Sequence, residues 1–138
     1  MPASTYLANM VLDSVLRGAG FTLPTRVYVS LHTADPGPTG LNEVTLAAWP
    51  SYQRQDPAGG ASMNSGFDPP ATKTTQNAKL MNWGAMNGAA DVTITHAAVW
   101  DAPTAGQLLV YGPTTTPKTF EPSDEASIRI GKLTETVI

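Results

Sequence analysis

The side chains best suited to acid–base chemistry lie in one segment, VTITHAAVWDAPTAGQLLVYGP, residues 92–113. It contains His96, Trp100 and Asp101, and a histidine oriented by a carboxylate is the general base of a catalytic triad. In an unbroken strand, however, His96 and Asp101 point to opposite faces, because side chains alternate and the two positions differ in parity. The chain also lacks a G-x-S-x-G segment that would present a nucleophilic serine. We therefore predict no catalytic residue and no enzymatic activity.

Metal and cofactor sites are not predicted either. His32 and His96 are the only histidines, the chain has no cysteine, and no H-x-H or H-E-x-x-H spacing places two ligands together. The acidic turn at Ser123, Asp124 and Glu125 lacks the alternating carboxylates of a calcium loop. The eleven acidic residues leave open a carboxylate pair of the kind that hydrolyses glycosides, since any two of them could meet in the fold.

The elements that would position these residues begin with a helix. Residues 4–17 place Leu7, Met10, Val11 and Val15 at spacings of three and four residues, which predicts a helix with an apolar stripe. Such a stripe is typical of a helix face that packs in the core or against another subunit.

The next segment, RVYVSLH, alternates between apolar and polar residues as a half-buried strand does. The predicted core face carries Val27, Val29 and Leu31. The opposite face is too polar for a core and is expected to meet water or a neighbouring molecule; it carries Arg26, Tyr28, Ser30 and His32.

Further short strands are predicted in the second half of the chain. Residues 92–112 have the pattern of a β-hairpin that turns at DAPTAG, with Trp100 in the core. The segment ASIRIG alternates and adds Ile128 and Ile130 to the predicted core. One helix followed by short strands and proline-rich turns predicts a mainly β fold, an antiparallel β-sandwich or jelly roll with one N-terminal α-helix. Residues 1–138 are predicted to form a single domain.

Regular patterning is lost within residues 33–72, which form long loops rich in proline and glycine. A compact domain rarely keeps so long an irregular connection without using it. Its large apolar side chains share no period, so we predict that they contact a partner and that residues 35–70 are ordered on that partner. The predicted partner interface comprises Leu41, Trp49, Tyr52 and Phe67, together with Arg26 and Tyr28. The N-terminal helix is the next choice for this contact.

Composition argues against two classes of partner. Charged residues make up 14% of the chain and the net charge is −3, so no basic surface is expected to hold nucleic acid. No stretch approaches the roughly 20 apolar residues of a membrane span, and the first residues lack the pattern of a signal peptide. We therefore expect a soluble protein that binds neither nucleic acid nor membrane.

Two longer segments carry a family resemblance. The first, TYLANMVLDSVLRGAGFTLPTRVYVSLHTADPGPTG, is a predicted helix followed by a strand that ends in L-H-T-A-D-P-G. The second, NWGAMNGAADVTITHAAVWDAPTAGQLLVYGPTTTPKTF, contains W-G, T-H-x-x-x-W-D, G-x-L-L-x-Y-G and T-x-x-K-T in order. Together they resemble a family of small structural proteins of tailed bacteriophages. Members are often labelled tail fibre proteins, and similar chains serve as capsid cement or decoration proteins with a jelly-roll fold.

The resemblance implies a virion protein without a cofactor. We expect it to bind the outside of the assembled capsid and to stabilise the shell by bridging subunits of the major capsid protein, as a homodimer or, second, a trimer. The alternative is a tail fibre or collar component that binds a host surface, with Trp49 and Tyr52 facing carbohydrate. A third hypothesis, a small hydrolase, requires a pocket with convergent acids or with His96.

Overall fold

The computed structural model describes residues 1–137, which form one α-helix and seven β-strands. The helix, α1, spans Thr5–Arg17 and has the boundaries that its end residues favour. The Ser4 side chain caps the first turn by accepting a hydrogen bond from the Leu7 amide at 3.0 Å. Gly18, with φ +67°, adopts the left-handed conformation that ends the helix.

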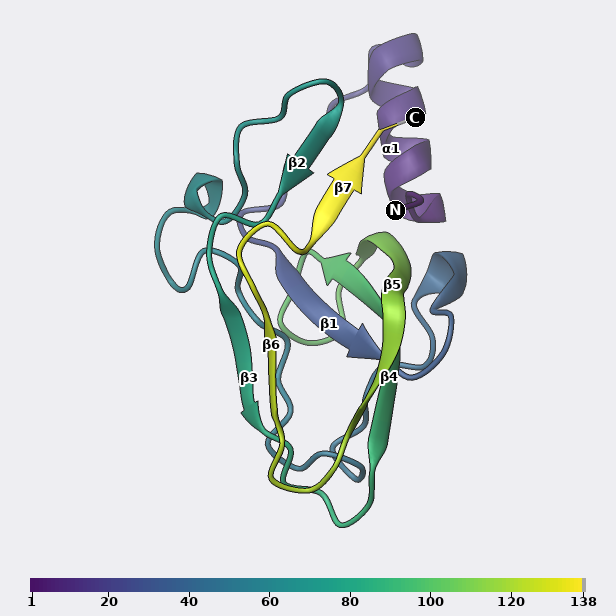
Figure 1. Cartoon of the computed structure of the whole chain (residues 1–138). Coiled ribbons are helices and arrows are strands. Elements are labelled where there is room, and N and C mark those ends of the chain that lie inside the picture. Colours follow the sequence, from purple (N-terminus) through teal and green to yellow (C-terminus); the bar gives the residue numbers. More distant parts are fainter. Residues whose placement is uncertain (138) are drawn as a thin grey trace.

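The largest sheet has three antiparallel strands in the order β1-β4-β5 (Figure 1). They span Tyr28–His32, Val92–Trp100 and Leu108–Phe120. Strands β4 and β5 form the hairpin predicted from the sequence, but their pairing extends further, to Val92 opposite Phe120. The register of β1 with β4 places His32 opposite His96 at one end of the ladder and Tyr28 opposite Trp100 at the other end.

Two smaller antiparallel sheets complete the fold. Strand β3, Met81–Ala85, pairs with β6, Glu125–Ile128, while β2, Thr74–Gln76, pairs with β7, Thr134–Thr136. The β3–β6 pair contributes Met81, Trp83 and Ala126 to the same core cluster as the three-stranded sheet. The mainly β, sandwich-like antiparallel fold with one N-terminal helix is therefore confirmed, whereas the more specific jelly-roll arrangement stays a prediction.

The core contains most, but not all, of the residues predicted for it. Val27, Val29, Leu31 and Trp100 are buried. Ile128 is only partly buried, and Ile130 is exposed, which corrects its predicted place in the core. Strand β6 ends at Ile128, and the chain then turns, with the Lys132 amide donating to the Arg129 carbonyl. The alternation that predicted Ile130 therefore stops two residues before it.

The irregular residues 33–58, which we call the tract, pack on the sheet. Isolated bridges join the tract to β1, at His32 with Glu43 and at Val29 with Gln55. Trp49 and Tyr52 are buried in the main core cluster, and the Trp49 ring lies 5.9 Å from the ring of Tyr52 and 6.2 Å from that of Phe120. The prediction that these two aromatic residues form a surface for a partner is therefore wrong, because the tract folds back and places them in the chain's own core.

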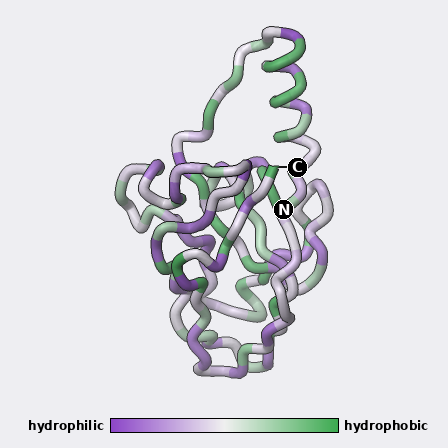
Figure 2. The backbone as a smooth tube through the Cα atoms, turned by 45° about the horizontal axis from the view of Figure 1, so that its top comes forward, coloured by the Kyte–Doolittle hydropathy of each residue, from purple (hydrophilic) through white to green (hydrophobic). Residues whose placement is uncertain are grey.

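In contrast, α1 projects from the rest of the molecule (Figures 1 and 2). Its base is fixed to β5, because the Ser4 amide donates to the Leu109 carbonyl at 2.8 Å and the Ser4 hydroxyl bonds to the Leu108 carbonyl. Every residue of α1 keeps part of its surface exposed. Residues 18–25 return from the helix tip to the body, and we call residues 5–25 the arm.

Candidate functional site

His96 and Asp101, the pair first considered for catalysis, are not hydrogen-bonded to each other. The His96 ring Nδ1 lies 2.8 Å from the Thr95 hydroxyl, whereas Asp101 Oδ1 accepts from the Gln107 amide at 2.7 Å and closes the hairpin turn. Each side chain has a local structural partner. Among residues 1–137, no group of three His, Cys, Asp or Glu side chains is placed to hold a metal ion.

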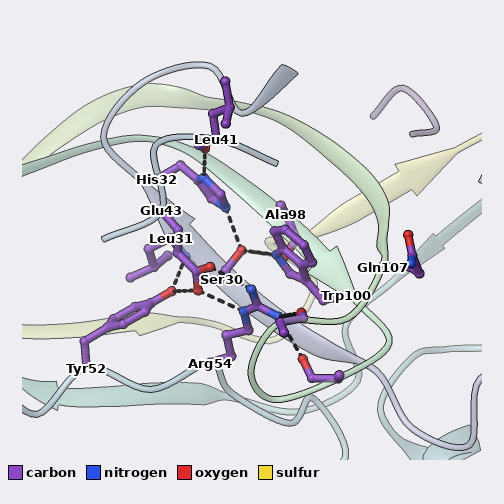
Figure 3. Close-up of polar contacts among 12 residues, drawn as sticks. Ser30, Leu31, His32, Leu41, Glu43, Tyr52, Arg54, Ala98, Trp100 and Gln107 are labelled. Carbon is purple, nitrogen blue, oxygen red and sulfur yellow. Dashed lines mark hydrogen bonds and ion pairs between the residues drawn. The ribbon is translucent and has the colours of Figure 1, made fainter. Parts of the chain in front are cut away.

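The structure instead places Ser30, His32 and Trp100 in one hydrogen-bonded chain (Figure 3). The Trp100 indole Nε1 donates to Ser30 Oγ at 2.8 Å, and Ser30 Oγ lies 2.7 Å from His32 Nε2. His32 Nδ1 lies 2.7 Å from the Leu41 carbonyl oxygen. Because a carbonyl can only accept, Nδ1 carries the proton, and Nε2 is the acceptor for the Ser30 hydroxyl.

A serine that donates to a histidine is the arrangement of an activated nucleophile, but this pair has no route to a substrate. Ser30 and His32 are fully buried, and the serine oxygen already accepts from the Trp100 indole. The partner of Nδ1 is a backbone carbonyl, where a triad has a carboxylate. Burial lowers the pKa of His32, which favours the neutral ring. The arrangement is that of a structural hydrogen-bond network.

A second polar cluster adjoins the first and centres on Glu43. Its carboxylate accepts from Arg54 Nε at 2.9 Å, from the second Arg54 nitrogen at 2.7 Å and from the Tyr52 hydroxyl at 3.0 Å. The Tyr52 oxygen in turn accepts from the Leu31 amide of β1 at 2.9 Å. Burial, with the adjacent Glu43 charge, raises the pKa of Tyr52, so the hydroxyl stays protonated and continues to donate.

Arg54 joins the two clusters to the hairpin turn. Its guanidinium lies 3.9 Å from the Trp100 ring centroid and donates to the carbonyls of Ala102, at 2.9 Å, and Ala105, at 2.8 Å. Only 6% of the Arg54 side chain is exposed. The Trp100 network, defined as Ser30, His32, Glu43, Tyr52, Arg54 and Trp100, therefore fastens β1, the tract and the turn after β4 to one another.

Sequence reasoning found the shared face of this network but not its environment. Alternation along β1 correctly grouped Ser30 with His32, but both were expected to face water or a neighbour, and both are buried. The missing information was the path of the tract, which covers this face. One signal was present in the sequence, the glycine at position 40. In the structure Gly40 has φ +85°, and a Cβ there would lie 2.3 Å from the Trp100 ring. Only glycine allows the tract to pass so close to this indole.

Other residues predicted to contact a partner have contacts within the chain. Arg26 donates to the Asp56 carboxylate and, at 2.9 Å, to the Ala61 carbonyl. Burial opposes ionisation of Asp56, but hydrogen bonds from the Gly60 and Ala58 amides and from Arg26 outweigh it and lower the pKa. Tyr28 is half-buried, and Phe67 packs partly buried against the core. Leu41 is exposed, and its contact with a partner stays a prediction.

Comparison with known proteins adds the family. The family described as "Podophage GP4 fiber I protein gp80" matches residues 2–136. No curated protein matches the chain. Among the described residues, no helix has the length and apolar character needed to cross a membrane. The match spans both segments that carried the sequence resemblance and the tract between them, so the chain belongs to this family of bacteriophage virion structural proteins.

Proposed function

We propose that the protein is a structural subunit of a phage fibre, without catalytic activity of its own. The observation that carries this proposal is the family match over residues 2–136, whose description names a fibre protein. The site geometry supports it, because the Ser30–His32 pair, which resembles an activated nucleophile, is fully buried and already hydrogen-bonded at each polar atom.

The Trp100 network suits a subunit whose role is mechanical. Long irregular loops are normally the mobile part of a small domain. Here the Tyr52 hydroxyl accepts from the Leu31 amide of β1. Arg54, paired with Glu43 inside the tract, donates to the Ala102 carbonyl of the hairpin turn, and such charge-assisted hydrogen bonds are stronger than neutral ones. A fibre subunit that transmits force through its neighbours needs such fixed surfaces.

Decoration of the capsid exterior, through the major capsid protein, is the second candidate. The family resemblance seen in the sequence includes chains that serve as capsid cement, and membership of a family of virion structural proteins agrees with this role. Two residues of its predicted contact surface, Trp49 and Tyr52, are however buried. The same burial removes the aromatic patch that was predicted to face host carbohydrate. The fibre proposal needs neither surface, and we therefore favour it.

Copy number in the virion distinguishes the two candidates. Purified particles would be digested and the protein quantified by mass spectrometry against the major capsid protein, with the portal protein as an internal low-copy standard. A fibre subunit should be present at a small fraction of the capsid protein, and gold-labelled antibodies should mark the tail region. Near-equal copy number, with label over the head, would overturn the fibre proposal in favour of decoration.

A further inference from the structure

A groove lies between β5 and the segment that contains β6 and the turn after it, where these two strands are not paired with each other. Figure 1 shows β5 and β6 diverging from the turn that joins them. The groove has a volume of about 540 Å³, which is within the range of pockets that hold small molecules. It shares no residue with the Trp100 network. We call it the basic groove, after the three cationic side chains that line it: Lys118, Arg129 and Lys132.

Most of the positive charge that is not already paired lies in this groove. Of the eight lysine and arginine residues, three arginines form ion pairs with acidic side chains, and the Lys79 ammonium donates to two oxygens of the chain. Three of the remaining four line the groove. Glu125 is the one acidic residue among the described residues of its lining, and the amino group of Met1 is paired with Glu135 at 3.3 Å. Three cations and one carboxylate give the lining a net charge of +2, on a chain whose net charge is −3.

The turn that presents two of these cations is fixed from inside the fold. Asn77 is fully buried, and its side chain donates to the Arg129 carbonyl at 3.0 Å and accepts from the Leu133 amide at 2.9 Å. The backbone that carries Arg129 and Lys132 is therefore held on both sides. A binding surface that is already ordered loses less conformational entropy when a ligand arrives.

The opposite wall of the groove is formed by a bulge in β5. The register of β4 with β5 places residues 114–117 opposite Thr95 alone, and the Thr114 hydroxyl donates to the Thr95 carbonyl at 3.0 Å. Bulges re-aim side chains and are common beside active sites. Lys118 follows the bulge, and its ammonium lies 5.7 Å from the Phe120 ring centroid. Both walls therefore present cations from irregular backbone that hydrogen bonds hold in place.

The rest of the lining indicates which kind of anion fits. Hydroxyl groups, which can both donate and accept, lie beside the cations on Thr114, Thr115, Ser127 and Thr134. An extended acidic peptide would need a regular strand edge with which to pair. The bulge interrupts the edge of β5 at this point, and the prolines at 113 and 117 have no amide hydrogen to donate. A sugar that carries an anionic group needs only the cations and the hydroxyls.

From these observations we propose that the basic groove binds an acidic saccharide, a sugar unit that carries a carboxylate or a phosphate group. Lys118, Arg129 and Lys132 contact the anionic group, and the hydroxyl-bearing side chains contact the hydroxyls of the sugar. This binding site goes beyond the structural role proposed above and does not depend on where in the virion the subunit lies.

The first test is a titration of the isotope-labelled chain followed by NMR. The probes are glucuronate and glucose 1-phosphate, with glucose, inorganic phosphate and a triglutamate peptide for comparison. Both acidic sugars should shift the amide signals of residues 127–134 and should bind at least about tenfold more tightly than glucose or inorganic phosphate. The absence of these shifts, or equal affinity for inorganic phosphate and glucose 1-phosphate, would overturn the proposal. Tighter binding of triglutamate would also overturn it, in favour of an acidic protein segment.

A second test uses two variants of equal net charge. Arg129→Gln/Lys132→Gln removes two cations from the groove and should weaken the binding of glucose 1-phosphate at least about tenfold. Arg17→Gln/Lys73→Gln removes one arginine and one lysine outside the groove and should bind like wild type. The side chains of Arg129 and Lys132 are exposed, so the groove variant should keep the dispersed NMR spectrum of the folded chain. Equal weakening in the two variants would show that overall charge alone attracts the anion, and would overturn the proposal.

Discussion

The arm and the tract differ in regularity and in burial: the arm is the more regular segment but the less buried one. The arm contains the most regular element of the chain, a capped helix with an apolar pattern, yet Val15 and Leu16 at its far end are largely exposed. The tract has almost no regular structure, yet Trp49 within it is fully buried. Regular local structure is therefore not a guide to which segment supplies the core of this protein.

The physical reason lies in what each segment can use as a partner. A helix satisfies its own backbone hydrogen bonds, so α1 can leave the body and still be formed. An irregular segment cannot, and its amides and carbonyls need partners elsewhere. The tract finds them on β1 and in its own turns, as in the bonds between Val29 and Gln55 and from Val44 to Leu31. Once the tract is held there, its large side chains Trp49 and Tyr52 lie in the core.

The largest expected effect is that of Trp49→Ala. Removing a fully buried indole from the core should lower the free energy of unfolding by about 3–5 kcal/mol. Urea unfolding of the variant and of wild type measures this difference. Leu41→Ala, in the same tract but exposed, is the control and should change stability by less than about 0.5 kcal/mol. Equal stability of Trp49→Ala and wild type would mean that the tract is not core.

The next effect tests how closely the tract approaches the hairpin. Gly40→Ala adds a Cβ that would lie 2.3 Å from the Trp100 ring, at a residue with φ +85°. We expect a loss of about 2–4 kcal/mol, from backbone strain and overpacking together. Gly60→Ala is a matched control, because Gly60 has φ +84° and open space around the added atom. The Gly60→Ala variant should lose only the stability that the backbone strain costs, about 1–2 kcal/mol. Equal losses for the two variants would show that Trp100 does not limit the tract.

A smaller effect concerns pH and the cover that the tract provides for His32. Burial lowers the pKa of His32 below its ordinary value of 6.5 in the folded chain, so the unfolded chain binds more protons. The contribution of His32 to stability is therefore complete above pH 6.5 and is lost as the pH falls below that value toward the lowered pKa of the folded chain.

The measurement is the slope of unfolding free energy against pH from about pH 7.5 to about pH 5, in wild type and in His32→Gln. The variant is expected to be less stable at neutral pH but to have a flatter slope. Burial also raises the pKa of Glu135, but this group is present in both proteins and cancels in the comparison. Parallel slopes would contradict a buried neutral His32.

The smallest effect is expected in the arm. Val15→Ala removes apolar atoms that are already exposed and introduces a better helix former. The unfolding free energy should change by less than about 0.5 kcal/mol, in either direction. Circular dichroism during urea unfolding measures it. A loss above about 2 kcal/mol would show that Val15 packs on another segment of its own chain.

The local elements of this protein could be predicted from its sequence pattern alone. Spacing and end residues predicted the helix over residues 4–17, and alternation predicted the strand with Val27, Val29 and Leu31 as well as the hairpin that contains Trp100. These patterns succeed because capping, periodicity and turn formation involve residues close together in the chain. The missing nucleophile motif and the parity of His96 and Asp101 likewise argued against a catalytic site in the hairpin.

Which surfaces are covered depends on how the segments pack together in the folded chain. Trp49 and Tyr52 enter the core because the tract crosses β1, and the same crossing buries the polar Ser30 and His32 against Trp100. Ile130 leaves the core because β6 ends two residues earlier. No local pattern encodes these outcomes, since burial depends on contacts between segments that are distant in the chain. Leu12, Val15 and Leu16 of α1 remain exposed for the same reason, because the rest of the described chain leaves them uncovered.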